Sequence, residues 1–252
     1  SFLHDKQWIG QVGLVSAEGG KEITDLTKSG YGGYMPRWAM DGKAIIFYSD
    51  RDGMKNHASW GGQSDAYAIF LTQEAFDKFK MTKEEAALAK EDEDKKKEGG
   101  DKKEGDDKDK KKKDEDKKKE EEKDNKVEPI KIELAGIDDR KVRLTPNSSE
   151  LSGAVLSKDG EKLYYLARFE KGSDLWQFEI RTHETKILNK MGEGFAGGLT
   201  LDKDGKNLFY MSSGAINRYD LEKNENKGVG INGEMLLNET AERAYLFEHI
   251  WR

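Results

Sequence analysis

The stretch GLTLDKDGKNLFYM, residues 198–211, contains a short apolar run, an Asp-Gly pair, and a second run that is apolar and aromatic. Residues 153–166 (GAVLSKDGEKLYYL) and residues 35–48 (MPRWAMDGKAIIFY) repeat the same order. Asp-Gly between two such runs is a strong hairpin signal, because both residues tolerate the positive φ of a tight turn. The sequence therefore predicts three β-hairpins of one repeating type.

Two further strand-like segments follow each hairpin. The expected third strands are residues 65–70, 174–180 and 215–221, and the expected fourth strands are residues 141–144, 185–188 and 227–231. Asp159 and Asp204 lie 45 residues apart, which is the spacing of a four-stranded propeller blade. Residues 1–27 fit only the last two strands of an earlier blade, at residues 9–15 and 22–26. We therefore expect an all-β fold: a partial β-propeller of about three and a half blades with antiparallel strands, forming an open arc.

Blades pack face to face and bury alternate side chains against their neighbours, so the aromatic residues of the repeats are expected in the core. The predicted core aromatics are Trp38, Phe47, Tyr164, Trp176, Phe209 and Tyr210.

The interval from Asp41 to Asp159 is 118 residues, about 73 more than one repeat. Residues 72–90 carry apolar residues at helical spacing and predict a helix. Residues 90–126 contain 16 Lys, 17 Asp or Glu, three Gly and one Asn, with no apolar side chain. Such a tract has no apolar area to offset the entropy of ordering, so we expect a disordered charged insertion.

The sequence offers no catalytic, cofactor-binding or metal-binding constellation, and none of its residues is predicted to serve in one. The histidines His4, His57, His183 and His249 have no second histidine or carboxylate three or four residues further along the chain, and there is no cysteine. Residues 192–197 match G-x-G-x-x-G, but a strand and hairpin follow where a phosphate-binding helix would be required, so we interpret them as a loop between blades. The glycine-rich loop Gly53–Ser64, with His57 and Trp60, is the loop that we expect to contact a bound peptide.

Composition excludes some partners. The net charge of −6 and the alternation of signs within the charged tract argue against nucleic acid, and no apolar run is long enough to span a membrane. Residues 236–252 carry an amphipathic helical pattern after a cap at Asn238. We therefore divide the chain into a partial propeller, residues 1–235, and the start of a helical segment, residues 236–252, which leads to a downstream domain.

The repeats resemble the WD40-like blades of the TolB and tricorn type, whose hairpins carry Ser-Pro-Asp-Gly-Lys. This chain keeps Asp-Gly and replaces Ser-Pro by Ala39-Met40, Ser157-Lys158 and Asp202-Lys203. Residues 136–145 resemble the last blade strand of tricorn-protease homologues, and residues 244–252 resemble the start of the helical domain that follows it. Residues 68–72, with the helix and the Lys/Glu tract, resemble the bacterial members.

The resemblance implies a propeller that precedes a helical subdomain, a PDZ domain and a serine-peptidase core. The peptidase residues of that family match nothing in this chain, so the segment itself is expected to be non-catalytic in a parent serine peptidase. It would admit or orient peptide or protein substrates for proteolysis, with the downstream PDZ and peptidase domains as partners and a homo-oligomer possible. Export of the bacterial members favours the periplasm, with the cytoplasm as the alternative. A stand-alone TolB-like propeller that acts as a protein-binding scaffold is the alternative function.

Overall fold

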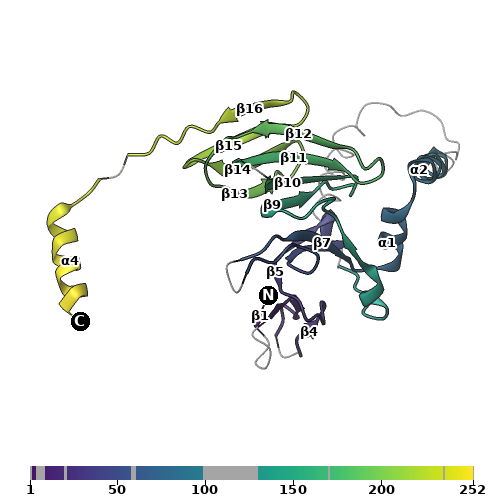
Figure 1. Ribbon diagram of the computed structural model, residues 1–252, viewed down its shortest axis with the longest axis horizontal. Coiled ribbons are helices and arrows are strands. Elements are labelled where there is room, and N and C mark those ends of the chain that lie inside the picture. The colour runs from purple at the N-terminus through teal and green to yellow at the C-terminus, as the bar shows by residue number, and fades with distance from the viewer. Residues whose placement is uncertain are drawn as a thin grey trace, which may run out of the picture.

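The computed structural model describes residues 2–3, 9–19, 22–57, 61–98, 130–169, 171–234 and 236–251. Three four-stranded antiparallel sheets follow one another along the chain, preceded by two short strand pairs near the N-terminus (Figure 1). We name the large sheets blades I, II and III, and the short strand pairs the N-terminal sheet. Within each blade the strands are hydrogen-bonded in chain order. This is the all-β partial propeller that the repeat predicts.

The strands have the following bounds. Blade I consists of β5 (Gly33–Ala39), β6 (Ala44–Ser49), β7 (Asp65–Phe70) and β8 (Lys141–Arg143). Blade II consists of β9 (Glu150–Leu156), β10 (Lys162–Arg168), β11 (Ser173–Glu179) and β12 (Thr185–Lys190). Blade III consists of β13 (Ala196–Leu201), β14 (Asn207–Ser212), β15 (Ala215–Asp220) and β16 (Glu225–Gly228). In the N-terminal sheet β1 (Phe2–Leu3) pairs with β2 (Gly10–Gln11), and β3 (Gly13–Leu14) pairs with β4 (Thr24–Asp25).

Two strand predictions need correction. The last strand of blade III is residues 225–228 rather than 227–231, because a tight turn starts it earlier: Asp220 Oδ1 accepts the amides of Glu222 and Lys223, each at 3.0 Å. The N-terminal sheet also contains β1, so residues 1–27 supply more than the two strands expected from the sequence.

The Asp-Gly turns form as predicted. Gly160 and Gly205 both have φ of 75°, a conformation that favours glycine. At the third turn, the short 3₁₀ helix η1 (Met40–Gly42), both Asp41 and Gly42 have positive φ.

Three apolar interfaces hold the sheets together. The N-terminal sheet covers one face of blade I through Val12 and Leu26, which pack on a cluster that includes Phe47 and Ile69. The other face of blade I packs on blade II, and the opposite face of blade II packs on blade III. The side chains at the I–II interface include Ile46, Tyr48, Phe70, Leu163, Tyr165 and Phe178, and those at the II–III interface include Tyr164, Leu166, Leu175, Leu199, Leu208 and Tyr210.

Most of the predicted core aromatics lie at these interfaces, but Trp38 does not. Phe47, Tyr164 and Tyr210 are buried, whereas Trp176 and Phe209 are half-buried. The prediction for Trp38 was wrong, because its side chain is 53% exposed. Trp38 pairs with Ile45 and so shares the face that the N-terminal sheet covers. That sheet reaches residues on β6 and β7 but leaves the neighbouring Trp38 on β5 uncovered.

Residues 72–90 contain one complete short helix and the start of a second helix rather than a single helix. Helix α1 (Gln73–Lys80) begins after Thr72, whose Oγ1 accepts the amide of Ala75. Helix α2 (Lys83–Glu98) begins with a capping box: Glu85 N donates to Thr82 Oγ1, and Thr82 N donates to Glu85 Oε2. The helix boundary was therefore encoded in the Thr82–Glu85 spacing.

Helix α2 also corrects the expectation for the charged tract. The first nine residues of the tract, Lys90–Glu98, belong to α2, and Lys90 Nζ lies 2.8 Å from Glu161 Oε1 in blade II. The disorder expected of the remainder, residues 99–126, falls outside the described residues.

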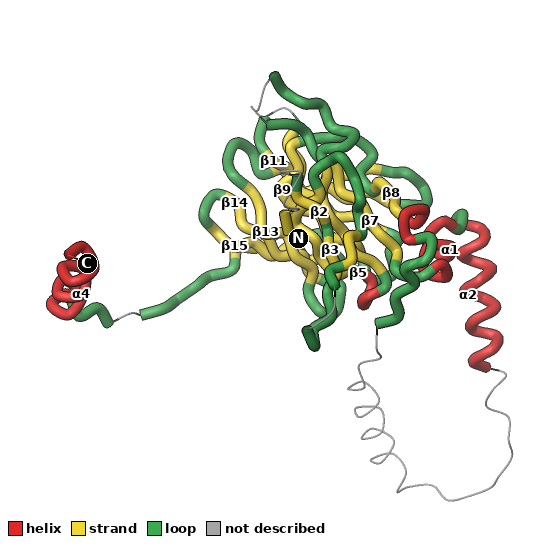
Figure 2. The backbone as a smooth tube through the Cα atoms, turned by 90° about the horizontal axis from the view of Figure 1, so that it is seen from below, coloured by secondary structure: helices red, strands yellow, loops and turns green. Residues whose placement is uncertain are grey.

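Helix α1 packs on the core shared by blades I and II, and α2 lies beside α1 at the same side of the molecule (Figure 2). Phe79 of α1 lies against Phe70 of blade I, with ring centroids 4.6 Å apart. On the blade II side, Arg181 donates hydrogen bonds to the carbonyls of Lys78 and Met81. Glu133, which precedes β8 in the chain, lies beside Leu71 at the end of β7, because Glu133 N donates to Leu71 O at 2.8 Å. The 3₁₀ helix η2 (Ile137–Arg140) then leads into β8, and the buried Arg140 donates to the carbonyls of Phe70, Glu133 and Ala135.

Helix α4 (Glu239–Trp251) stands apart from the blades at the end of an extended segment (Figure 1). Its cap is the predicted one, since Ala241 N donates to Asn238 Oδ1 at 3.1 Å. The division of the chain at residue 235 into two segments stays a prediction.

The Tyr48 hydroxyl joins blades I and II and gives a first test of the interface. Ala154 N of β9 donates to Tyr48 Oη at 2.7 Å, and both residues are buried. We expect Tyr48→Phe to lower the free energy of unfolding by about 2 kcal/mol, because the buried amide loses its acceptor. Urea unfolding measures this loss. Tyr34→Phe is the control, since Tyr34 is 39% exposed and should change stability by less than about 0.5 kcal/mol. Equal losses in the two variants would contradict the role given to the hydroxyl.

Candidate functional site

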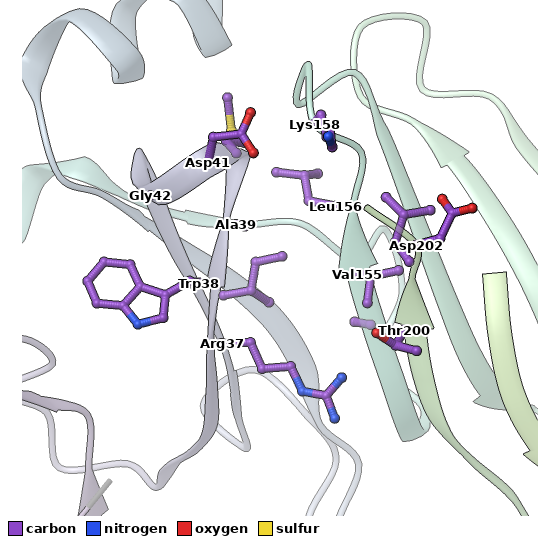
Figure 3. A pocket seen from close by; sticks show the side chains of 14 residues that line it. Arg37, Trp38, Ala39, Asp41, Gly42, Val155, Leu156, Lys158, Thr200 and Asp202 are labelled. Atoms are coloured by element: carbon purple, nitrogen blue, oxygen red, sulfur yellow. The ribbon is translucent and has the colours of Figure 1, made fainter. Parts of the chain in front are cut away.

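The first strands of the three blades, β5, β9 and β13, come together and leave a groove between them. Each of these strands is hydrogen-bonded on one side only within its blade. They enclose a cavity of about 350 Å³, lined from all three blades (Figure 3). We call this cavity the axial groove. It is built from segments as far apart in the sequence as Arg37 and Asp202, so only the stacking of the blades creates it.

Apolar side chains form the middle of the axial groove. Ile46, Val155, Leu156 and Leu201 line it, and Ile46 and Leu156 are buried. Figure 3 shows the Arg37 side chain directed toward β13, whereas the Trp38 ring points away from the groove. Adjacent residues of a strand point to opposite faces, so the two side chains of β5 cannot both enter.

Charged side chains mark both ends of the axial groove. Arg37 lies at one end, and Asp41, Lys158 and Asp202, from the three hairpin turns, lie at the other. Burial raises the pKa of Asp202, but hydrogen bonds from the Asn207 side chain and from the backbone amides of the turn outweigh it and hold that pKa below its usual value. Asp202 is therefore ionised at neutral pH.

A second cavity, of about 760 Å³, lies at the beginnings of the same three strands. We call it the upper cavity. Its lining includes Tyr34 at the start of β5, Ser152 on β9 and Ala196 at the start of β13. The loop Gly53–Ser64 contributes Gly62 and Ser64 to it. Gly53 is required there, because a Cβ at this position would lie 1.9 Å from Gln63 O.

Arg37 lies between the two cavities. Its Nη1 donates to Leu199 O of β13 at 2.7 Å, a contact between blades I and III. Along β5 Arg37 follows Tyr34 of the upper cavity, and along β13 Leu199 precedes Thr200 of the axial groove. Nothing local in the sequence marks Arg37, since only the relative position of blades I and III gives it this place.

The other sequence-based site predictions have mixed outcomes. His57 is exposed and lines neither cavity, and Trp60 lies outside the described residues. Of residues 192–197, interpreted from the sequence as a loop between blades, residues 192–195 form the loop between blades II and III, whereas Ala196 and Gly197 begin β13. Glu193 and Gly194 border the upper cavity. Among the described residues no group of three or more His, Cys, Asp or Glu is placed to hold a metal ion. No helix in the described part of the chain is long and apolar enough to cross a membrane.

Stacked four-stranded antiparallel sheets with their first strands around a common groove define the class of protein: the chain is a partial β-propeller. No protein-family model matches it, and comparison with curated proteins finds no similar sequence.

Among solved structures, the crystal structure of the tricorn protease is similar to 90% of this chain, with a TM-score of 0.52 and 13% sequence identity. TolB from Acinetobacter baumannii matches 85% of the chain with a TM-score of 0.44 and 13% identity. The propeller domain of the Trilobed protease from Pyrococcus furiosus matches 79% with a TM-score of 0.40 and 10% identity. The chain spans 20%, 36% and 43% of these three structures, respectively. At these identities the likeness to the tricorn protease shows a shared propeller fold.

Proposed function

We propose that this chain is a non-catalytic propeller segment of a tricorn-like serine peptidase and that it admits or orients peptide substrates for proteolysis. The observation that carries the proposal is the axial groove, with an apolar middle and charged ends, on a fold similar to that of the tricorn protease. Ligand sites in proteins combine apolar walls with a few charged groups in this way. The PDZ and peptidase domains, a homo-oligomeric assembly and a periplasmic location belong to the same proposal.

A propeller that guides substrates should affect cleavage according to peptide length. We expect removal of residues 1–235 from the parent polypeptide to change kcat/KM for a 20-residue peptide by about tenfold or more, and for a tetrapeptide by less than about threefold. A tetrapeptide reaches a peptidase site without guidance, whereas a long chain has to be threaded or aligned. Steady-state cleavage of the two peptides by the full and the shortened polypeptide measures the difference.

Circular dichroism and thermal unfolding show whether the remaining domains stay folded, which is the necessary control. Loss of tetrapeptide cleavage together with that of the long peptide, in folded remaining domains, would contradict the proposal. A parent polypeptide with no peptidase activity would instead favour the stand-alone binding scaffold.

A further inference from the structure

Resting on the proposed function, we infer that the axial groove binds extended peptides by a carboxylate, and that Arg37 is the residue that selects it. The carboxylate is either the C-terminal group of the peptide or an Asp or Glu side chain. The arrangement of Arg37, of the charges at the far end and of the apolar middle supports this inference.

The Arg37 guanidinium has donors available for a ligand. A guanidinium carries five N–H groups in a planar fork. In the described part of the chain one hydrogen bond is found for it, the one to Leu199 O. The side chain is half-buried and lines the axial groove. A carboxylate can accept two parallel hydrogen bonds from such a fork, and these charge-assisted bonds are stronger than one to a neutral carbonyl. A bound carboxylate would therefore occupy the remaining donors or replace the carbonyl of Leu199.

The charges of the groove also give a bound peptide one direction. The end opposite Arg37 holds two carboxylates, Asp41 and Asp202, and one ammonium group, Lys158. With two acidic side chains and one basic side chain, this end carries a formal net charge of −1. A peptide with its carboxylate at Arg37 places its amino-terminal side toward the negative end, and the reverse orientation opposes both charges.

The length and lining of the groove suit a short peptide segment. From Arg37 to Ala39, the last residue of β5, the strand advances two residues, about 7 Å at roughly 3.3 Å per residue, and an extended peptide of two to three residues covers this distance to the turn at η1. Val155, Leu156 and Leu201 line the space between the ends, so an apolar side chain next to the carboxylate is favoured. The cavity of about 350 Å³ lies toward the small end of known ligand pockets.

The test uses the 252-residue chain and a pentapeptide, Ala-Leu-Ala-Leu-Ala, in three forms. One form has a free C-terminus, the second has a C-terminal amide, and the third has the amide and a central Glu. Isothermal titration calorimetry at low salt measures each dissociation constant. We expect the free carboxylate to bind about tenfold or more tightly than the amide, because it adds charge-assisted hydrogen bonds. Equal binding of the third form and the free acid would identify the side chain as an equivalent source of the carboxylate.

Variants then assign the effect to one residue. Arg37→Gln should bind the free acid and the amide equally weakly, and Arg37→Lys should retain part of the preference, because it keeps the charge without the fork. Lys203→Gln is the matched control: it removes one positive charge from an exposed residue of the turn beside Asp202 and should keep the full preference.

The inference is overturned if the wild-type chain binds acid and amide equally, or if Arg37→Gln keeps the preference. If thermal unfolding shows that Arg37→Gln is misfolded, Arg37→Lys carries the comparison, and an unchanged preference in it likewise overturns the inference. The binding measurement needs no peptidase domain, so it can fail while the length-dependent cleavage test succeeds, and the reverse.

Discussion

Replacement of Asp65 by alanine is expected to lower the free energy of unfolding by about 3 kcal/mol, because it removes a buried carboxylate that three side chains share. Asp65 is fully buried. Its Oδ1 accepts from Arg143 Nη2 at 2.9 Å and from Thr145 Oγ1 at 2.7 Å, and its Oδ2 accepts from Ser148 Oγ at 2.8 Å. These partners lie at the end of β8 and in the segment that crosses to blade II. The variant should therefore destabilise the segment that connects blade I to blade II as well as blade I itself.

Two further variants make the Asp65 measurement specific. Asp65→Asn should lose about 1 to 2 kcal/mol, because it keeps the shape and one acceptor oxygen. Asp204→Ala removes an exposed carboxylate from a hairpin turn and should stay within about 0.5 kcal/mol of the wild type. Urea unfolding of the three variants gives the differences. An Asp65→Ala chain as stable as Asp204→Ala would show that the shared carboxylate does not stabilise the blade.

Alkaline unfolding is the second large effect that the structure leads us to expect. Tyr165 is buried at the interface of blades I and II, and Tyr164 at that of blades II and III. Burial raises the pKa of Tyr165 to about 12. Burial, assisted by Asp159 and Glu179, raises the pKa of Tyr164 to about 12.

The direction of the pH dependence follows from proton binding. In the unfolded chain these phenols ionise near pH 10, while in the folded chain they keep their protons to about pH 12. Between these values the unfolded state binds fewer protons, so stability falls as the pH rises. The stability is fully present below pH 10, and about 5 kcal/mol in total is expected to be lost by pH 12 from the two groups.

The measurement is urea unfolding at steps from pH 8 to pH 12. The double variant Tyr164→Phe/Tyr165→Phe should keep a flatter stability profile above pH 10, because it lacks two of the buried phenols that ionise at these interfaces. Tyr245→Phe, at an exposed position of α4, should follow the wild type. Parallel profiles for the wild type and the double variant would contradict the assignment.

The blades could be predicted from the sequence because their signals are local. An Asp-Gly pair favours a tight turn through its own two residues, and the 45-residue spacing of Asp159 and Asp204 repeats one blade. The third strand of blade I was predicted at its observed bounds, residues 65–70. Both ends of that strand are marked, by a polar glycine-rich loop before it and by a helix cap after it.

Features that depend on the relative positions of the blades could not be predicted from the sequence. Trp38 has the composition and spacing of a core residue, but its burial depends on whether a neighbouring sheet reaches β5. Arg37 resembles any polar residue of a strand until blade III brings Leu199 beside it. The Thr82–Glu85 capping box is different: it is a local signal, and the helical periodicity on both sides of it obscured the break.

The junction where the chain leaves blade I after β7 and returns before β8 has a consequence for engineering. Leu71 and Glu133 are joined there by a backbone hydrogen bond, and Arg140 donates to the carbonyls of Phe70 and Glu133. These bonds hold the end of β7 next to the segment that leads into β8, and none of them involves a residue between Leu71 and Glu133. The entropy of closing such a connection rises only with the logarithm of its length, by about 0.6 kcal/mol per doubling. We therefore expect that a reporter domain can be inserted after α2, or new termini opened there by circular permutation, without loss of the β7–β8 pairing.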